Sequence, residues 1–220
     1  MRYIKEKQML FLHIIKTGGV AVENAIDSRW PLGWRMRHRK DGKPGWHMRK
    51  SDIAGLPFVP TAFAFCFVRH PLHWHISCWR HLQFMRRRRV RRGSNLMDMF
   101  HWFDWHPQMW YAEQNELDFN AWIDRIVERD PGHLSKMFEE YVGLDRKTPN
   151  VQYVGRQETL TEDLDHLLQI SKTPLKNFAQ WPMPKISKQS IQNILKSEKQ
   201  ILHRYYGLET SNFRYVEDWK

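Results

Sequence analysis

Four residues in the first tenth of the sequence have the chemistry of an anion-binding loop. Residues 16–19 read Lys-Thr-Gly-Gly and lie between an apolar run, 9–15, and a segment with helical spacing, 20–26. Glycine lets backbone N–H groups approach an anion closely, and both a lysine and a helix N-terminus add positive charge. The lysine precedes the glycines, so this is not the G-x-x-x-x-G-K-[ST] loop of nucleoside triphosphatases. We predict a loop for a phosphate or sulfate, with an ordinary strand-to-helix turn as the alternative.

An arginine follows a second apolar run in the same way. Residues 63–68 read as a buried strand that ends at Arg69-His70-Pro71, and Pro71 suits the first turn of a helix running through Leu82. In open parallel sheets, ligands bind beyond the carboxyl ends of the strands. The Lys-Thr-Gly-Gly loop and Arg69 both fall at such ends, so position and chemistry agree.

Neither the histidines nor the cysteines form a recognisable metal motif. The two cysteines, Cys66 and Cys78, stand in apolar surroundings without a C-x-x-C pattern, which predicts neither a disulfide framework nor a thiolate metal site. Four histidines crowd one segment without an H-E-x-x-H pattern or an accompanying carboxylate. We therefore predict no metal and expect helix-surface positions for these four, His70, His73, His75 and His81.

Apolar strands alternating with helices predict the fold class. After the two strand–loop–helix units above, residues 151–154 read as a third strand, and Thr159 with Glu162 matches a capping box before a helix. Asp118 is a candidate cap for another helix, 119–127, and residues 191–205 have the spacing of a closing amphipathic helix. This alternation predicts an α/β fold with a central parallel sheet covered by helices on both faces. We expect one domain over residues 1–220, with a long surface loop at 30–50.

The charge of the chain predicts an anionic partner. Lys and Arg number 35 against 24 Asp and Glu, a formal net charge of +11. This attracts anions without distinguishing nucleic acid, anionic glycan, acidic membrane or a phosphate-rich nucleotide. Six of the seven residues from Arg86 to Arg92 are arginines, so we expect a flexible basic arm at 85–93 that contacts a polyanion or is simply solvated.

The sequence contains no apolar run long enough for a membrane span, which needs about 20 residues. The apolar run 9–15 contains a histidine and lacks a small-residue cleavage site, so we interpret it as a strand rather than a signal peptide. These features predict a cytoplasmic protein.

Three segments together resemble the carbohydrate-type sulfotransferases, the family that includes the heparan sulfate 2-O- and 6-O-sulfotransferases and related bacterial enzymes. Residues 12–19, Leu-His-Ile-Ile-Lys-Thr-Gly-Gly, are similar to the family's H-I-P-K-T-G-G loop. Residues 67–71, Phe-Val-Arg-His-Pro, followed by Ser77, resemble its F-V-R-x-P element with a serine eight residues after the arginine. Residues 154–158 with 162–164 resemble its V-G-R-x-E-x-L-x-x-D-L stretch. The resemblance extends from about residue 9 to about residue 170 and implies a P-loop NTPase-like three-layer fold.

The resemblance implies a PAPS-dependent O-sulfotransferase, in which 3'-phosphoadenosine 5'-phosphosulfate (PAPS) gives its sulfuryl group to a hydroxyl, expected to be on a glycan. It makes Lys16, Thr17, Gly18 and Gly19 the cradle of the 5'-phosphosulfate. Arg69 and Ser77 become the clamp on the 3'-phosphate, for which the planar guanidinium is well suited.

The same resemblance assigns the catalytic roles. Sulfuryl transfer needs a base for the acceptor proton and a cation for the leaving phosphate, and no metal. Lys16 supplies the cation, and His47 is the candidate base, because residues 46–53 resemble the family's histidine segment between the two nucleotide loops. A loop histidine can also be simply exposed to solvent. His13, on the strand leading into the phosphosulfate loop, is the next candidate.

The sequence departs from the family pattern at several positions. Ile15 replaces the family's proline, and Val20 and Ala21 replace the hydroxyl residues that usually follow the glycine pair, so backbone N–H groups and Lys16 would carry more of the phosphate binding. Trp74 stands where the family usually has an arginine. These departures leave a second hypothesis open, a non-catalytic module that binds a polyanion or nucleic acid on the same nucleotide-binding fold.

Overall fold

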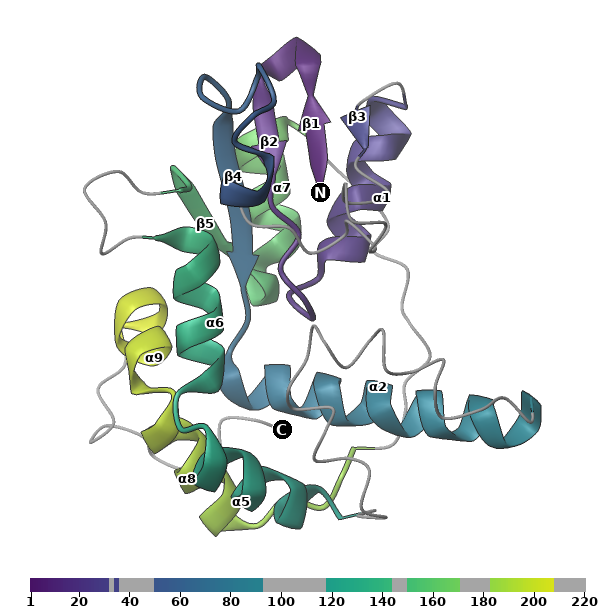
Figure 1. Ribbon diagram of the computed structural model, residues 1–220, viewed down its shortest axis with the longest axis vertical. Coiled ribbons are helices and arrows are strands. Elements are labelled where there is room, and N and C mark those ends of the chain that lie inside the picture. The colour runs from purple at the N-terminus through teal and green to yellow at the C-terminus, as the bar shows by residue number, and fades with distance from the viewer. Residues whose placement is uncertain (32–33, 36–49, 93–117, 144–149, 171–182, 208–220) are drawn as a thin grey trace. The chain divides into compact units, whose positions relative to one another are not determined.

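The computed structural model describes the chain except for residues 32–33, 36–49, 93–117, 144–149, 171–182 and 208–220, and except for the side chains of residues 34, 35, 52 and 85–92 (Figure 1). The described chain divides into two compact units. The first consists of residues 1–69 and 136–180, and the second of residues 70–135 and 181–220. The expectation of one domain over residues 1–220 stays a prediction.

The first unit is built on a five-stranded sheet in the order β3-β1-β2-β4-β5. Its three neighbouring strands β2, β4 and β5 are parallel, while β1 is antiparallel to both β2 and β3 (Figure 1). The strands are β1 (Arg2–Ile4), β2 (Met9–Phe11), β3 (Trp34–Arg35), β4 (Phe63–Val68) and β5 (Tyr153–Arg156). The parallel part of the sheet contains the three strands that the sequence predicts.

Two helices, α1 (Gly19–Arg29) and α7 (Leu160–Leu168), pack on one face of this sheet. Alternate residues of β2 and β4, among them Phe11, Phe65 and Phe67, form a single buried core with the apolar faces of these helices. The residues between them, Leu10 and Cys66, are also fully buried, so both faces of the central strands are covered. The predicted α/β three-layer class, with parallel strands flanked by helices, is confirmed.

The described part of the second unit is helical. Its described helices are α2 (Pro71–Arg92), α5 (Phe119–Arg129), the start of α6 (His133–Val142), α8 (Lys188–Ser197) and α9 (Lys199–Tyr206). As predicted, Asp118 caps α5, because its carboxylate accepts the N–H of Ala121 at 3.1 Å, and the α5 stripe that includes Trp122 and Ile126 is buried. None of the described helices is both long enough and apolar enough to cross a membrane.

Two helix boundaries and one helix cap differ from the predictions. The backbone of α2 continues to Arg92, so residues 86–92 are helical where an arm was expected. The closing amphipathic helix is two helices, because the backbone turns at Glu198 between α8 and α9. Thr159 does not form a capping box with Glu162: its hydroxyl donates to the side chain of Asp163 at 3.0 Å, and no side-chain hydrogen bond caps α7 there.

Candidate functional site

The loops that follow the three parallel strands meet in the first unit. Arg69, directly after β4, donates from Nη1 to the carbonyl oxygen of Lys16 at 3.2 Å. The segment after β5 is also close to the loop, because a Cβ added to Gly18 would be 3.2 Å from side-chain atoms of both Gln157 and Leu160. The Lys-Thr-Gly-Gly loop therefore contacts the segments that follow β4 and β5, at the edge where open parallel sheets bind ligands.

The loop itself has a strained backbone. Lys16 adopts a left-handed conformation with φ 61°, which side chains other than glycine rarely adopt, and Gly18 has φ 88°. Thr17 is buried, and its hydroxyl donates to the carbonyl of Ile14 at 2.9 Å, which closes the loop on itself. Strained residues persist where the surroundings over-determine them. Here the guanidinium of Arg69 holds the carbonyl of the strained residue itself, and the hydroxyl of Thr17 holds the carbonyl of Ile14, two residues before it.

The loop leads into the N-terminus of α1, which is suited to bind an anion. Gly18 is the N-cap residue, and its carbonyl accepts the N–H groups of Ala21 and Val22 at 2.9 and 3.2 Å. Among the described side chains none caps this end, and the first turn contains no acidic residue. A helix N-terminus of this kind presents backbone N–H groups and a partial positive charge to an anion. Val20, with 46% of its surface exposed, adds no hydroxyl to this surface.

A buried histidine and glutamate lie behind the loop. His13 Nδ1 is 3.1 Å from Glu23 Oε1, and only 3% of His13 and 7% of Glu23 is exposed. The N-terminal amino group also donates to Glu23 Oε1, at 2.7 Å, and Arg2 Nη2 lies 4.0 Å from the other carboxylate oxygen. Burial lowers the pKa of His13 in spite of its hydrogen bond to Glu23. Burial would raise the pKa of Glu23, but the hydrogen bond from His13 and the nearby positive charges lower it to about 2.

One carboxylate organises the loop after β5. Asp163 accepts hydrogen bonds from the hydroxyl of Tyr153 at 2.9 Å, the N–H of Arg156 at 2.8 Å and the hydroxyl of Thr159 at 3.0 Å. Burial and the bond to Asp163 raise the pKa of Tyr153 to about 12. Asp163 thus fixes the short 3-10 helix Gln157–Thr159 that packs against Gly18.

The structure brings some of the predicted site residues together. Lys16, Thr17, Gly18, Gly19 and Arg69 form one arrangement in the first unit. The side chain of Thr17 is used within the loop rather than toward a ligand.

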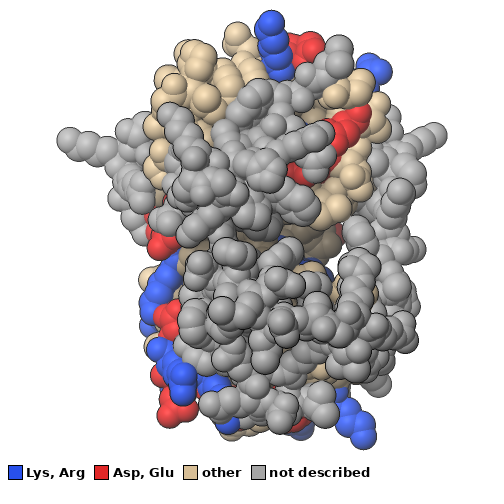
Figure 2. Space-filling view, turned by 45° about the vertical axis from the view of Figure 1, so that its right-hand side comes forward, with Lys and Arg blue, Asp and Glu red and all other residues tan. Residues whose placement is uncertain are grey.

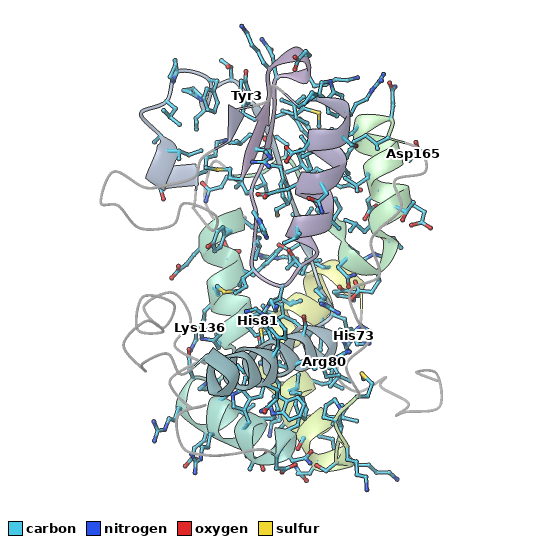
Figure 3. All side chains as sticks on the ribbon, turned by 90° about the vertical axis from the view of Figure 1, so that its right-hand side faces the viewer. Tyr3, His73, Arg80, His81, Lys136 and Asp165 are labelled. Atoms are coloured by element: carbon cyan, nitrogen blue, oxygen red, sulfur yellow. The ribbon has the colours of Figure 1, made fainter. Side chains whose placement is uncertain are left out.

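Other predicted residues are placed elsewhere or not described. Ser77 is half-buried on α2 in the second unit, and Figure 3 labels three other residues of the same helix, His73, Arg80 and His81. Its role in a 3'-phosphate clamp stays a prediction. His47 lies outside the described residues, and so do the side chains of Arg86–Arg92.

The expectation of helix-surface histidines is wrong at two of the four positions. His70 and His75 are 2% and 1% exposed, because they pack against aromatic rings of the second unit. The ring centroid of His70 lies 5.4 Å from that of Tyr206, and that of His75 lies 6.1 Å from that of Trp122. Among the described residues, no group of three or more His, Cys, Asp or Glu could hold a metal ion.

Sequence reasoning missed two parts of the site. The bond from Arg69 to the Lys16 carbonyl joins residues 53 positions apart and leaves no local signal. The pairing of His13 with Glu23 was not predicted either, although a charged residue directly after Val22, on the apolar face of a short helix, is a usable signal for a buried partner.

Comparison with known proteins agrees with this geometry. The sequence matches the model of the sulfotransferase family over residues 2–216, which includes residues of both compact units. Neither the comparison with curated proteins nor the comparison with solved structures gives a match. Because the family match covers almost the whole sequence, the chain belongs to the sulfotransferase family.

Proposed function

We propose that this sulfotransferase moves a sulfuryl group from PAPS to a hydroxyl of an acceptor, and that the acceptor is a carbohydrate. The observation that carries the proposal is the bond from Arg69 to the Lys16 carbonyl, which joins the second predicted nucleotide element to the strained loop at the start of α1. This bond holds a cation against the loop that leads into the N-terminus of α1, an end suited to an anion. The family match supports sulfuryl transfer in general.

The donor would be bound mainly by main-chain groups and Lys16. Val20 and Ala21 supply no hydroxyl, and the Thr17 hydroxyl is bonded to Ile14, so the 5'-phosphosulfate would be held by N–H groups at the start of α1. Arg69, next to this loop, would bind the 3'-phosphate together with Ser77.

In the proposed reaction the acceptor oxygen attacks the sulfur atom of PAPS. A new S–O bond forms to the acceptor while the S–O bond to the 5'-phosphate breaks, which leaves 3'-phosphoadenosine 5'-phosphate (PAP). His47 would take the hydroxyl proton, and Lys16 would neutralise the charge that develops on the leaving phosphate oxygen. The step needs no metal.

The acceptor assignment depends on charge. The net charge of +11 and the arginines of the α2 extension, Arg86–Arg92, favour an anionic glycan. On the face shown in Figure 2, the described Lys and Arg side chains lie among Asp and Glu, so they mark no basic surface of their own there. A cytoplasmic location, where PAPS would be available, belongs to the same proposal.

A non-catalytic polyanion-binding or nucleic-acid-binding module is the second candidate. The exposed apolar Val20 at the anion-binding end of α1 favours it, since a hydroxyl there would add a hydrogen bond to a phosphate. Such a module would bind heparin or nucleic acid through charge and would have no reason to bind PAP specifically.

One set of measurements tests the proposal. PAP binding is followed by calorimetry and thermal shift, and transfer is followed from labelled PAPS to a panel of glycans. The wild type should bind PAP and be stabilised by it, because a ligand that binds only the folded state stabilises that state. Arg69→Ala and Lys16→Ala should lose most of the binding, and Lys16→Ala should also lose rate. His47→Ala should bind PAP normally while turnover falls by ~10²–10⁴-fold, as expected for loss of a general base.

Lys7→Ala, which removes an exposed lysine from the turn before β2, is the matched control and should change neither quantity. If millimolar PAP left the melting temperature of the wild type unchanged, the donor assignment would be wrong. Full activity in His47→Ala would show that another residue is the base.

A further inference from the structure

The ring of His13 occupies the space that a side chain on Gly19 would need. A Cβ added to Gly19 would lie 2.0 Å from Cδ2, 2.1 Å from Nε2 and 2.7 Å from Cγ of His13. Real Cβ atoms essentially never approach other atoms closer than 3.0 Å. The close approach of His13 therefore requires glycine at the first residue of α1.

Glu23 holds the same ring from the other side. It lies on α1 four residues after Gly19, one helical turn further, and its Oε1 is 3.1 Å from His13 Nδ1. A carboxylate can only accept, so Nδ1 of His13 donates this hydrogen bond. The ring of Phe11 stacks on the sheet side at a centroid distance of 5.9 Å. His13 thus contacts α1 at two places: the backbone of Gly19 in the first turn and the side chain of Glu23 one turn later.

We infer that His13 is a positioning residue that sets the first turn of α1, and with it the N–H groups that bind the donor phosphosulfate. The inference rests on the proposed function, because it assigns His13 to the loop that binds PAPS. His13 lies on the segment between β2 and Lys16, so the same ring links the strand, the loop and the helix. Since 3% of its surface is exposed, His13 is poorly placed to take a proton from an acceptor hydroxyl, and this argues against it as the base.

A double-mutant cycle between His13 and Gly19 tests the inference. PAP affinity is measured by calorimetry for the wild type, His13→Ala, Gly19→Ala and the double variant. Gly19→Ala should weaken PAP binding on the order of tenfold, as coupled neighbours do, because its Cβ displaces the ring. His13→Ala should weaken it by a similar factor. In the double variant, Gly19→Ala should add little, because the ring that it would strike is gone.

Ile26→Ala separates a positioning role from general destabilisation. Ile26 is fully buried on the same helix, two turns after Gly19, so its truncation lowers the melting temperature without touching His13. The folded Ile26→Ala protein should bind PAP within about twofold of the wild type, a small fraction of a tenfold change.

Each result has one meaning. Wild-type PAP affinity in His13→Ala, or equal losses from Gly19→Ala with and without His13, would overturn the inference and leave the proposed function intact. A wild type that does not bind PAP would overturn the proposed function and the inference with it. If His13→Ala does not fold, His13→Gln takes its place in the cycle, with melting temperature as a second readout of the same coupling.

Discussion

Among the described residues, a buried histidine–glutamate pair is found in each compact unit, and the two pairs differ in what else the carboxylate and the imidazole contact. In the first unit His13 Nδ1 lies 3.1 Å from Glu23, and the ring occupies the space beside Gly19 that a Cβ atom would need. In the second unit His75 Nε2 lies 3.9 Å from Glu198, and the histidine is packed among aromatic rings.

Glu198 also accepts hydrogen bonds from the first turn of a helix. It accepts the N–H groups of Leu134 and Ser135 at 3.1 and 2.8 Å and the hydroxyl of Ser135 at 2.7 Å. These N–H groups belong to the first turn of α6, so Glu198 caps that helix from the junction of α8 and α9. Its neighbours are structural elements of the second unit alone.

The comparison indicates that burial of a histidine–glutamate pair does not by itself mark a functional site. Glu198 accepts hydrogen bonds from the N–H groups at a helix end, which would otherwise need water as an acceptor. This is a structural role. Glu23 instead fixes a ring that bears on a strained, glycine-containing loop. On our inference, the Glu23 arrangement sets the first turn of α1 at the proposed donor site, whereas the Glu198 arrangement holds a helix end within the second unit.

Removal of the Glu198 carboxylate should have the largest effect on stability. Glu198→Ala leaves two N–H groups and a hydroxyl buried without an acceptor, so we expect the free energy of unfolding to fall by about 3 kcal/mol or more. Urea unfolding followed by tryptophan fluorescence measures the loss. Folded Glu198→Ala should still bind PAP with wild-type affinity.

Glu128→Ala, at an exposed position of α5, is the control and should change stability by less than about 0.5 kcal/mol. A loss of PAP affinity in Glu198→Ala, greater than the fraction of unfolded protein explains, would remove the distinction between the two pairs.

The His13–Glu23 pair should make the free energy of unfolding fall as the pH is lowered. The pKa of His13 is lowered from 6.5, so the unfolded chain binds more protons below that pH, and the contribution of neutral His13 is lost as pH falls through 6.5. The pKa of Glu23 is lowered from 4.5 to about 2, so its contribution is complete above 4.5 and is lost as pH falls toward 2. The N-terminal amino group and Arg2 also face Glu23, at 2.7 and 4.0 Å.

Urea unfolding between pH 7.5 and pH 3 covers the His13 window and the upper part of the Glu23 window, with those limits set by roughly one pH unit on either side of the ordinary pKa values. His13→Gln should flatten the decline just below pH 6.5, and Glu23→Gln should flatten the decline that begins near 4.5. His203→Gln, at an exposed position of α9, should leave the profile unchanged. An unchanged decline in His13→Gln would mean that other groups cause the acid sensitivity.

The sequence predicted the parallel part of the fold and the strand–loop–helix turn at residues 16–19 because both have local signals; the anion-binding role of that loop stays a prediction. Residues 63–68 form β4 with the predicted bounds, since a continuous apolar run stops at Arg69 and Pro71. The strands β1 and β3, which add the antiparallel part of the sheet, were not predicted, because three and two residues are too few to show an alternating pattern. The break between α8 and α9 was missed because the apolar spacing continues across Glu198, whose partners, Leu134 and Ser135, lie more than 60 positions away.

Residue types identified the loop, but its support depends on contacts that only the fold creates. Lys16 to Gly19 could be recognised from composition and order. The contacts of the loop with Arg69 and Gln157 follow from the neighbouring positions of β2, β4 and β5 in the sheet. The capping-box prediction at Thr159 failed because Asp163, one turn on, takes the hydroxyl for a network that also holds Tyr153.

The smallest expected effect gives the sharpest comparison, because it removes one buried hydroxyl from each unit. Ser135→Ala loses the hydroxyl that donates to Glu198 at 2.7 Å, and Thr17→Val loses the hydroxyl that donates to the Ile14 carbonyl at 2.9 Å. Each variant should lose about 1 kcal/mol of stability, the usual net contribution of one hydrogen bond. Only Thr17→Val should also weaken PAP binding, by roughly two- to tenfold or about 0.4–1.4 kcal/mol, because it loosens the loop at Lys16. Calorimetry measures the PAP affinity of both variants, and urea unfolding measures their stability. Equal PAP affinities would mean that Arg69 and His13 hold the loop without the Thr17 tether, whereas a loss in Ser135→Ala would show that the second unit's pair also acts on the donor site.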